Sequence, residues 1–289
     1  MTVSKSAVLY RDLALEVLPL VGAEGNHIIL KNDQKIYLTP RGGAAVSCIG
    51  WGNKRVAQAI MDQILEAPYC ATIFYTTKVQ KRLYRSLVDS TKGHMARAYI
   101  VNSGNGSCSK ACQTSYHGTT LGALAVRGHE YRRAEFEPFL MKNVSRMSLC
   151  FEYHGKKPDE SGDSYVARLI KELEDEFQRF GPERVYVFIA EPMVGAYRGI
   201  FKAVQAGCQR YSTLLILDEV ICGIGRTGTL YAWEQEDIVP DIQTIGKALG
   251  GGAFAHGHTY QGHPAACAAA LEVQQIIQKE KLLDNIRDL

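Results

Sequence analysis

Apolar runs of strand length alternate along the chain with stretches in which apolar residues recur at helical spacing. Residues 185–190 and 214–217 are continuous apolar runs, typical of strands buried on both faces of a parallel sheet, and residues 242–245 form a shorter strand-like run. Between them, residues 165–180 carry one apolar stripe and residues 201–211 lead back to the next strand. This order predicts an α/β fold of three layers, αβα, with a mostly parallel central sheet.

The rest of the chain predicts further elements on either side of this core. We expect an irregular helix over residues 7–21, a hairpin over 28–38, helices over 54–65, 79–90 and 265–279, and a first sheet strand over 98–101. The predicted domains are an N-terminal segment, residues 1–45, a large domain, residues 46–262, and the beginning of a C-terminal domain, residues 263–289.

Composition and charge narrow the classes of function. At 289 residues with 46% hydrophobic content, the chain can bury a sizeable core. Its net charge of +3 comes with no basic stripe, so we expect neither nucleic acid nor a membrane as partner. The eight cysteines include no C-x-x-C pair, and no apolar run approaches the ~20 residues of a spanning helix. We therefore expect a cytoplasmic protein, with an organelle left open, and a small molecule as its partner.

An acid and an amine carry the candidate chemistry. Asp218 follows the apolar run 214–217, at the sheet edge where ligands of α/β folds bind, and Lys247 precedes three consecutive glycines. A carbonyl cofactor with a pyridine ring needs an amine to hold it, an anion to keep its ring nitrogen protonated, and donors for its phosphate. The amine also needs a lowered pKa to act as nucleophile and base. Asp218, Lys247 and the glycine-rich turns supply these groups.

Three other interpretations compete for parts of the chain. Residues 223–228 match G-x-G-x-x-G, the dinucleotide fingerprint, but they begin too far after the strand and open no apolar helix. Residues 104–110 resemble a phosphate-binding loop that lacks the glycine before its lysine and the Ser or Thr after it. His256, His258 and His263 could suggest a metal, yet no carboxylate stands at ligand spacing. We expect a turn there and no metal site.

Four sequence blocks resemble one family. They are FIAEP at residues 188–192, LLILDEVICGIGRTGTLYAWE at 214–234, PDIQTIGKALGGG at 240–252 and HGHTYQGHPAACAAALEV at 256–273. The shorter blocks FYTT, VNSG and SYHGTTLGAL support them. With these blocks the chain resembles the class III pyridoxal-phosphate-dependent aminotransferases of fold type I. The resemblance implies pyridoxal 5′-phosphate as cofactor, bound by the large domain, and a homodimer.

The resemblance also implies roles for residues that hold the cofactor ring. Lys247 would form a Schiff base with the cofactor and Asp218 would pair with the pyridine nitrogen. Tyr116 and His117 would lie against the ring, and Glu191 would support the site from behind the residues that touch the cofactor.

The remaining implied roles concern the phosphate and the substrate. Gly104 and Asn105 would bind the phosphate, and Thr259 would reach the phosphate site of the partner subunit. Phe74 and Tyr75 would line the substrate pocket. An amino acid or ω-amine would donate its amino group, and a 2-oxo acid such as pyruvate or 2-oxoglutarate would accept it.

The chain also departs from the family pattern. Asn105 and Gly106 stand where the family has a Ser or Thr followed by Glu-Ala, and the helix and strand that follow there in the family are missing. Most of the C-terminal domain, which usually carries an arginine for the substrate carboxylate, is missing too. Two hypotheses follow: an aminotransferase that uses Lys247, or a shortened, catalytically dead relative that partners an intact homologue or reflects an incomplete gene product.

Overall fold

The computed structural model describes residues 18–32, 34–37, 46–101, 110–112, 115–148, 152–192, 199–250 and 261–288. Three sheets are formed within them. β1 (Leu20–Glu24), β2 (His27–Leu30) and β3 (Lys35–Tyr37) make an antiparallel sheet near the N-terminus. β4 (Lys110–Cys112) pairs in parallel with β5 (Ser145–Met147), and β6 (Val187–Ala190), β7 (Leu214–Asp218) and β8 (Ile242–Thr244) form a parallel sheet with β7 in the middle.

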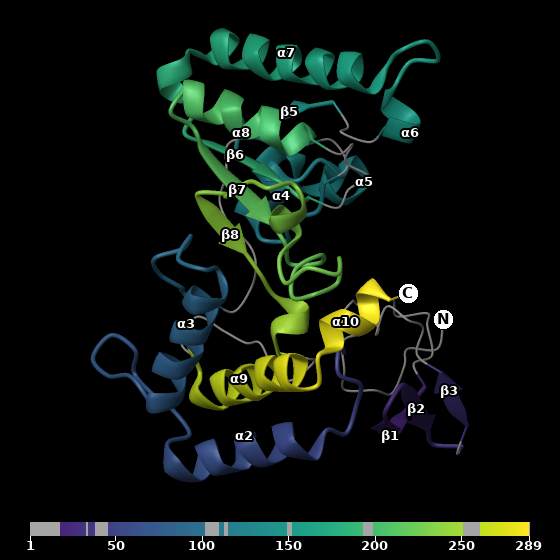
Figure 1. Cartoon of the computed structure of the whole chain (residues 1–289), viewed down its shortest axis with the longest axis vertical. Helices are drawn as coiled ribbons and strands as arrows, with labels where there is room; N and C mark the ends of the chain where they lie inside the picture. The colour runs from purple at the N-terminus through teal and green to yellow at the C-terminus, as the bar shows by residue number, and fades with distance from the viewer. Residues whose placement is uncertain are drawn as a thin grey trace.

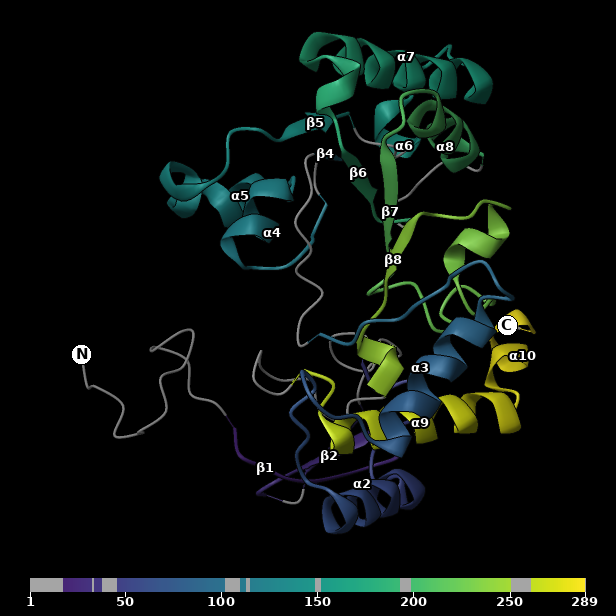
Figure 2. The same cartoon turned by 90° about the vertical axis from the view of Figure 1, so that its left-hand side faces the viewer.

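The sheet β6-β7-β8 is covered on both faces because its strands are apolar throughout. Leu215 and Leu217 of β7 belong to a core that includes α7 (Gly162–Phe180) and α8 (Ile200–Arg210). Ile216, between them, faces the other way and packs with Val126 of α4 (Leu121–Val126). Figure 2 shows the result, with α7 and α8 on one side of the strands and α4 with α5 (Glu130–Arg133) on the other. The predicted α/β fold of three layers is thereby confirmed.

Helix α7 illustrates how the sequence sets an element of this core. Its start is fixed by Ser161, whose hydroxyl accepts a hydrogen bond from the Ser164 amide at 3.1 Å. Its inner face is a stripe of fully buried side chains spaced three or four residues apart: Tyr165, Leu169, Leu173 and Phe177. It ends at Gly181, whose φ of +86° is costly for any side chain.

A second helical layer lies at the other end of the molecule (Figure 1). α9 (Pro264–Lys279) packs between α2 (Lys54–Glu66) and α3 (Lys78–Ser90), and its alanines allow a close approach. α3 starts at a capping box, in which Thr77 and Gln80 each bond the backbone of the other. α9 also contacts the turn η4 (Lys247–Gly250), so this layer supports the segment that carries Lys247.

The remaining short elements connect these layers. They are η1 (Ala134–Phe139), α6 (Glu152–Gly155), η2 (Pro182–Arg184), η3 (Ala232–Gln235) and α10 (Leu282–Arg287). Within the part of the chain that the structure describes, no helix is both long and apolar enough to cross a membrane.

The structure corrects three details of the predicted elements. The end of the expected helix 7–21 is instead β1, which begins at Leu20 and adds a third strand to the predicted hairpin; residues 7–17 lie outside the described residues. Residues 98–101 pair with no described strand, and Tyr99 and Val101 are exposed, so this apolar run has no sheet neighbour to stabilise it as a strand. β4 follows it instead, parallel to β5 and beside β6. The predicted domain boundaries stay a prediction.

Candidate functional site

Asp218 ends β7 and is the centre of a buried polar cluster. Its side chain is 5% exposed. Oδ1 accepts hydrogen bonds from the Val220 amide at 3.1 Å and from the Thr244 hydroxyl at 3.2 Å, and Oδ2 is 2.8 Å from His117 Nδ1. Because an ionised carboxylate only accepts, Nδ1 is the donor in this last bond. Residues from β7, from β8 and from the segment before α4 are thus brought together at the carboxyl end of the sheet.

His117 approaches Asp218 from the loop that precedes α4. Its side chain is fully buried, and its Nε2 has no hydrogen-bond partner among the described residues. A buried nitrogen without a partner is costly, so its retention is typical of a site that receives another group. The structure joins His117 to the carboxylate, and contact of His117 with a cofactor ring stays a prediction.

Tyr116 is held between a carboxylate and a guanidinium. Its amide donates to Glu191 Oε1 at 2.6 Å, and the Arg127 guanidinium carbon lies 4.0 Å from the centre of its ring. Glu191 immediately follows β6, as Asp218 ends β7. Burial raises the pKa of Glu191, while the Tyr116 amide, His117 and Lys247 oppose that shift. Those opposing effects locate Glu191 in the same electrostatic neighbourhood as the predicted cofactor residues.

Lys247 begins the turn η4, three residues beyond Thr244. Its φ of +44° lies in the left-handed region, which a lysine adopts only where its surroundings impose it. Burial lowers the pKa of its amine, and the positive charge of Arg226 lowers it further, whereas Glu191 and Asp218 act in the opposite direction. A lowered pKa leaves more of the amine neutral, which is the form that attacks a carbonyl group.

Glu219 is a second buried carboxylate next to Asp218, and it faces the start of η3. Its side chain accepts hydrogen bonds from the Trp233 amide at 2.8 Å, the Ala232 amide at 3.0 Å and Gln243 Nε2 at 3.1 Å. The Ala232 and Trp233 amides lie at the start of η3, where N–H groups have no partner within the helix. Burial raises the pKa of Glu219 to about 7. This carboxylate therefore links η3 to β8.

The raised pKa of Glu219 predicts a pH-dependent stability. Because the folded-state pKa is about 7 against an ordinary 4.5, protonation favours the folded chain. This group stabilises the folded chain by about 3 kcal/mol below pH 4.5, and that stabilisation is lost as pH rises through 7. We expect the free energy of unfolding in urea, measured for the wild type and for Glu219→Gln, to give a difference that decreases by about 3 kcal/mol as pH rises from 4.5 through 7. A difference that stays constant with pH contradicts the assignment.

The glycines of residues 223–228 serve a packing role in this structure. A side chain on Gly225 would collide with Leu283 of α10, and the Gly228 carbonyl accepts a hydrogen bond from Arg287 of the same helix at 2.6 Å. Both glycines have positive φ, and the segment leads into η3 rather than into a long helix. This geometry explains the G-x-G-x-x-G match without a dinucleotide.

Among the described residues, the predicted substrate-pocket residues Phe74 and Tyr75 are exposed and make no hydrogen bond with Asp218. Phe74 and Tyr75 lie between α2 and α3 with exposed fractions of 78% and 71%, so the described fold forms no pocket over them. Gly104, Asn105 and Thr259 lie outside the described residues. Their phosphate-binding roles stay a prediction.

Three contact residues were missed by the sequence interpretation. Thr244 stands three positions before Lys247, and only the strand register of β8 against β7 brings its hydroxyl to Asp218. Glu219 follows Asp218 in the sequence, which was a signal, but its partners Ala232 and Trp233 are distant in the chain. Arg127 is fully buried, which is unusual for an arginine and could not be read from its place in the sequence.

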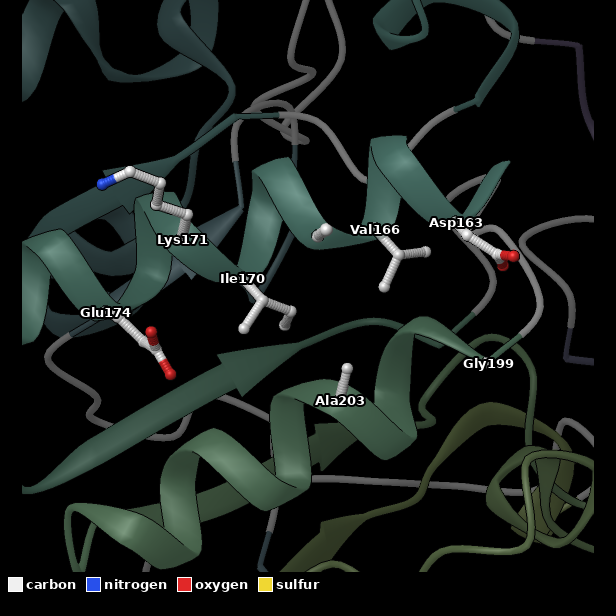
Figure 3. A pocket seen from close by; sticks show the side chains of 8 residues that line it. Asp163, Val166, Ile170, Lys171, Glu174, Gly199 and Ala203 are labelled. Carbon is white, nitrogen blue, oxygen red and sulfur yellow. The ribbon is translucent and has the colours of Figure 1, made fainter. Parts of the chain in front are cut away.

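A surface hollow elsewhere in the molecule takes no part in this cluster. Figure 3 shows it between α7 and α8, and it is lined by Asp163, Val166, Ala167, Ile170, Lys171, Glu174, Gly199 and Ala203. None of these residues belongs to the polar cluster. Among the described residues, no group of three or more His, Cys, Asp or Glu side chains is placed to hold a metal ion.

The sequence is similar to those of known aminotransferases. The sequence model of the family "aminotransferase class-III" matches residues 109–289. An aminotransferase of Gibberella zeae is 39% identical over 96% of this chain and 65% of its own length. An uncharacterised aminotransferase of Schizosaccharomyces pombe is 38% identical over 93% of this chain and 70% of its own. The chloroplastic gamma aminobutyrate transaminase 3 of Solanum lycopersicum is 30% identical over 94% of this chain and 62% of its own length. The chain thus spans about two thirds of the length of these relatives.

Comparisons of structure agree with this assignment at the level of the fold. An amine transaminase from an uncultivated Pseudomonas species, solved in its PLP-bound form, matches with a TM-score of 0.90 and 22% identity. That match covers 98% of this chain and 77% of the other. The omega transaminase of Pseudomonas jessenii in complex with PMP matches with a TM-score of 0.87 and 24% identity, over 92% and 70% of the two chains.

Proposed function

Because the chain belongs to the class III aminotransferase family, we propose that it transfers an amino group from an amine donor to a 2-oxo acid with pyridoxal 5′-phosphate as cofactor. The observation that supports this most is the buried cluster of Asp218, His117 and Thr244 at the sheet edge next to Lys247. When bound, the cofactor supplies a carbonyl group and a ring that accepts electrons from the substrate. This chain supplies the charges and the proton carrier around it.

The ring end of the cofactor fits the hydrogen-bonding capacity of Asp218. An ionised carboxylate offers about four acceptor positions, and Val220, Thr244 and His117 occupy three of them. One position is left for a pyridinium N–H. An ionised carboxylate at this position would hold that ring proton in place.

The carbonyl end of the cofactor fits Lys247. The pKa of the amine is lowered, which increases its neutral, nucleophilic fraction, and a neutral amine can also accept and return a proton at the substrate carbon. Glu191 and Asp218 limit the shift of its pKa. That balance keeps the amine able to hold a proton during the reaction.

The phosphate end calls for a second copy of the chain. We propose that Gly104 and Asn105 bind the phosphate and that Thr259 of one subunit reaches the phosphate of its partner, which makes the protein a homodimer. The exposed aromatic rings of Phe74 and Tyr75 favour this arrangement, because large apolar side chains left in solvent are typical of contact surfaces. In the dimer these rings would line the substrate pocket.

The donor is proposed from the names of the relatives. The tomato relative is a gamma aminobutyrate transaminase, and the structural relatives are omega and amine transaminases. We infer a donor whose amino group is distant from a carboxylate, or a simple amine, and pyruvate or 2-oxoglutarate as acceptor. A cytoplasmic location stays a prediction from the scattered cysteines.

Amino-group transfer is tested as two half-reactions. Purified protein with pyridoxal 5′-phosphate is expected to acquire a visible absorbance band, gamma-aminobutyrate or a simple ω-amine to bleach it, and pyruvate or 2-oxoglutarate to restore it. A band that no donor bleaches would favour the alternative, a relative that binds the cofactor without catalysis. No band in the folded protein sinks the proposal.

A further inference from the structure

Glu219 is buried beside the proposed cofactor site, yet no step of the proposed reaction uses it. It is 1% exposed and directly follows Asp218. Successive side chains of a strand point to opposite sides, and here Asp218 turns to His117 while Glu219 turns to η3. The carboxylate has three donors, which offset part of the cost of burying it.

The contacts of Glu219 converge on β8, the strand that leads to Lys247. Its side chain accepts from Gln243 Nε2, and its own amide donates to the Thr244 carbonyl at 2.8 Å. Thr244 in turn donates its hydroxyl to Asp218. Asp218 and Glu219 therefore both bond Thr244, and Glu219 bonds Gln243 as well. Lys247 follows Thr244 after only two residues, and β8 runs toward η4 and α9 (Figure 1).

Gly223 packs closely against Glu219. A methyl group on Gly223 would lie 2.8 Å from the Glu219 carbonyl oxygen and 3.1 Å from its Oε2. The Gly223 amide also donates to that carbonyl at 2.9 Å. The backbone of the loop therefore approaches the Glu219 side chain closely, and the absence of a side chain on Gly223 makes this approach possible.

We propose that Glu219 is a positioning residue, whose carboxylate joins η3 to β8 and thereby fixes Asp218, Thr244 and Lys247 relative to one another. This rests on the proposed function for its catalytic consequence. The mechanical part stands on the hydrogen bonds alone. An amide in place of the carboxylate keeps the side-chain volume but turns one acceptor into a donor. Either the bond from the Trp233 amide or the bonds from the Ala232 amide and Gln243 are then lost, and the join between η3 and β8 weakens.

Hydrogen–deuterium exchange of the cofactor-free protein tests the mechanical part. In Glu219→Gln, we expect amides of residues 242–247 to exchange about tenfold to a hundredfold faster, together with those of residues 231–235. Glu234→Gln is the matched control, because Glu234 bonds the Tyr231 amide at 3.1 Å within the η3 turn and pairs with Lys92. It should affect residues 231–235 alone. Faster exchange in Glu219→Gln that is confined to residues 231–235 would overturn the proposal.

The cofactor-loaded protein tests the catalytic consequence. With pyridoxal 5′-phosphate bound, Glu219→Gln is expected to shift the pH midpoint of the visible band and to raise the Kd for the cofactor roughly tenfold, whereas Glu234→Gln changes neither. An unaltered midpoint and Kd would overturn the positioning role. If the wild type forms no band, the proposed function fails. Hydrogen–deuterium exchange of residues 242–247 in the cofactor-free protein then decides whether Glu219 joins η3 to β8.

A milder variant covers the case in which Glu219→Gln does not fold. Gln243→Ala removes one of the three donors to Glu219, on a partly buried residue of β8. We expect the same increase in exchange over residues 242–247, about threefold to tenfold. Unchanged exchange there in a folded Gln243→Ala protein would refute the proposal.

Discussion

Replacement of Lys247 by alanine is expected to abolish covalent capture of pyridoxal 5′-phosphate and to lower kcat for amino-group transfer by roughly 10⁴-fold or more. The reason is that the chain then lacks both the nucleophile with a lowered pKa and the proton carrier next to Asp218 and Glu191. The measurement is single-turnover bleaching of the visible band by an amine donor. Lys247→Arg, which keeps the charge but cannot attack a carbonyl, should be equally inactive.

The matched control for this variant is Lys202→Ala. Lys202 is an exposed lysine of α8 that pairs with Asp237 on the surface, at 3.2 Å. We expect the visible absorbance band of Lys202→Ala and its rate of bleaching by the amine donor to equal those of the wild type. Comparable turnover by Lys247→Ala and by the control would remove Lys247 from the proposed reaction.

Replacement of Asp218 by asparagine is expected to leave the cofactor bound but to lower the rate of proton transfer by about 10²-fold to 10³-fold. Asparagine keeps the volume, and its oxygen can still accept from Thr244 and Val220, but its NH2 group then faces His117 Nδ1 and it lacks the charge that holds a proton on the pyridine nitrogen. A deuterium label on the donor carbon reports this step directly, through its loss to solvent in a single turnover.

Asp237→Asn is the control for the charge change. Asp237 is exposed, its side chain is 92% accessible, and it lies near the end of η3, where it contacts only Lys202 among the ion pairs described. Its replacement should leave label loss unchanged. Full proton-transfer rates in Asp218→Asn would refute its role as partner of the ring nitrogen.

The strands and helices of the core could be predicted because their signals are local. The apolar run at residues 214–217 and the stripe from Tyr165 to Phe177 carry burial in their spacing, and β7 and α7 formed as expected. Residues 98–101 have a similar apolar character but failed, because a strand also needs a neighbour and none of the described strands pairs with them. Pairing is a property of the whole fold, which a single segment does not encode.

The candidate site divides in the same way. Asp218 and Lys247 could be proposed from residue type and position, since each chemistry needs a specific group, and their catalytic roles stay a prediction. The partners of Asp218 could not be derived, because the His117 bond joins residues 101 positions apart and Thr244 reaches Asp218 only through the register of β8. The pKa shifts of Lys247 and Glu219 likewise arise from burial, which exists only in the folded chain.

Covalent capture tests the central claim most directly. The wild-type protein, loaded with pyridoxal 5′-phosphate and reduced with borohydride, is digested and its peptides are mapped by mass spectrometry. The account predicts one stoichiometric adduct, on Lys247, which sits on the turn behind β8 with an amine of lowered pKa. Capture spread over exposed lysines, or absent from a folded protein, would contradict it.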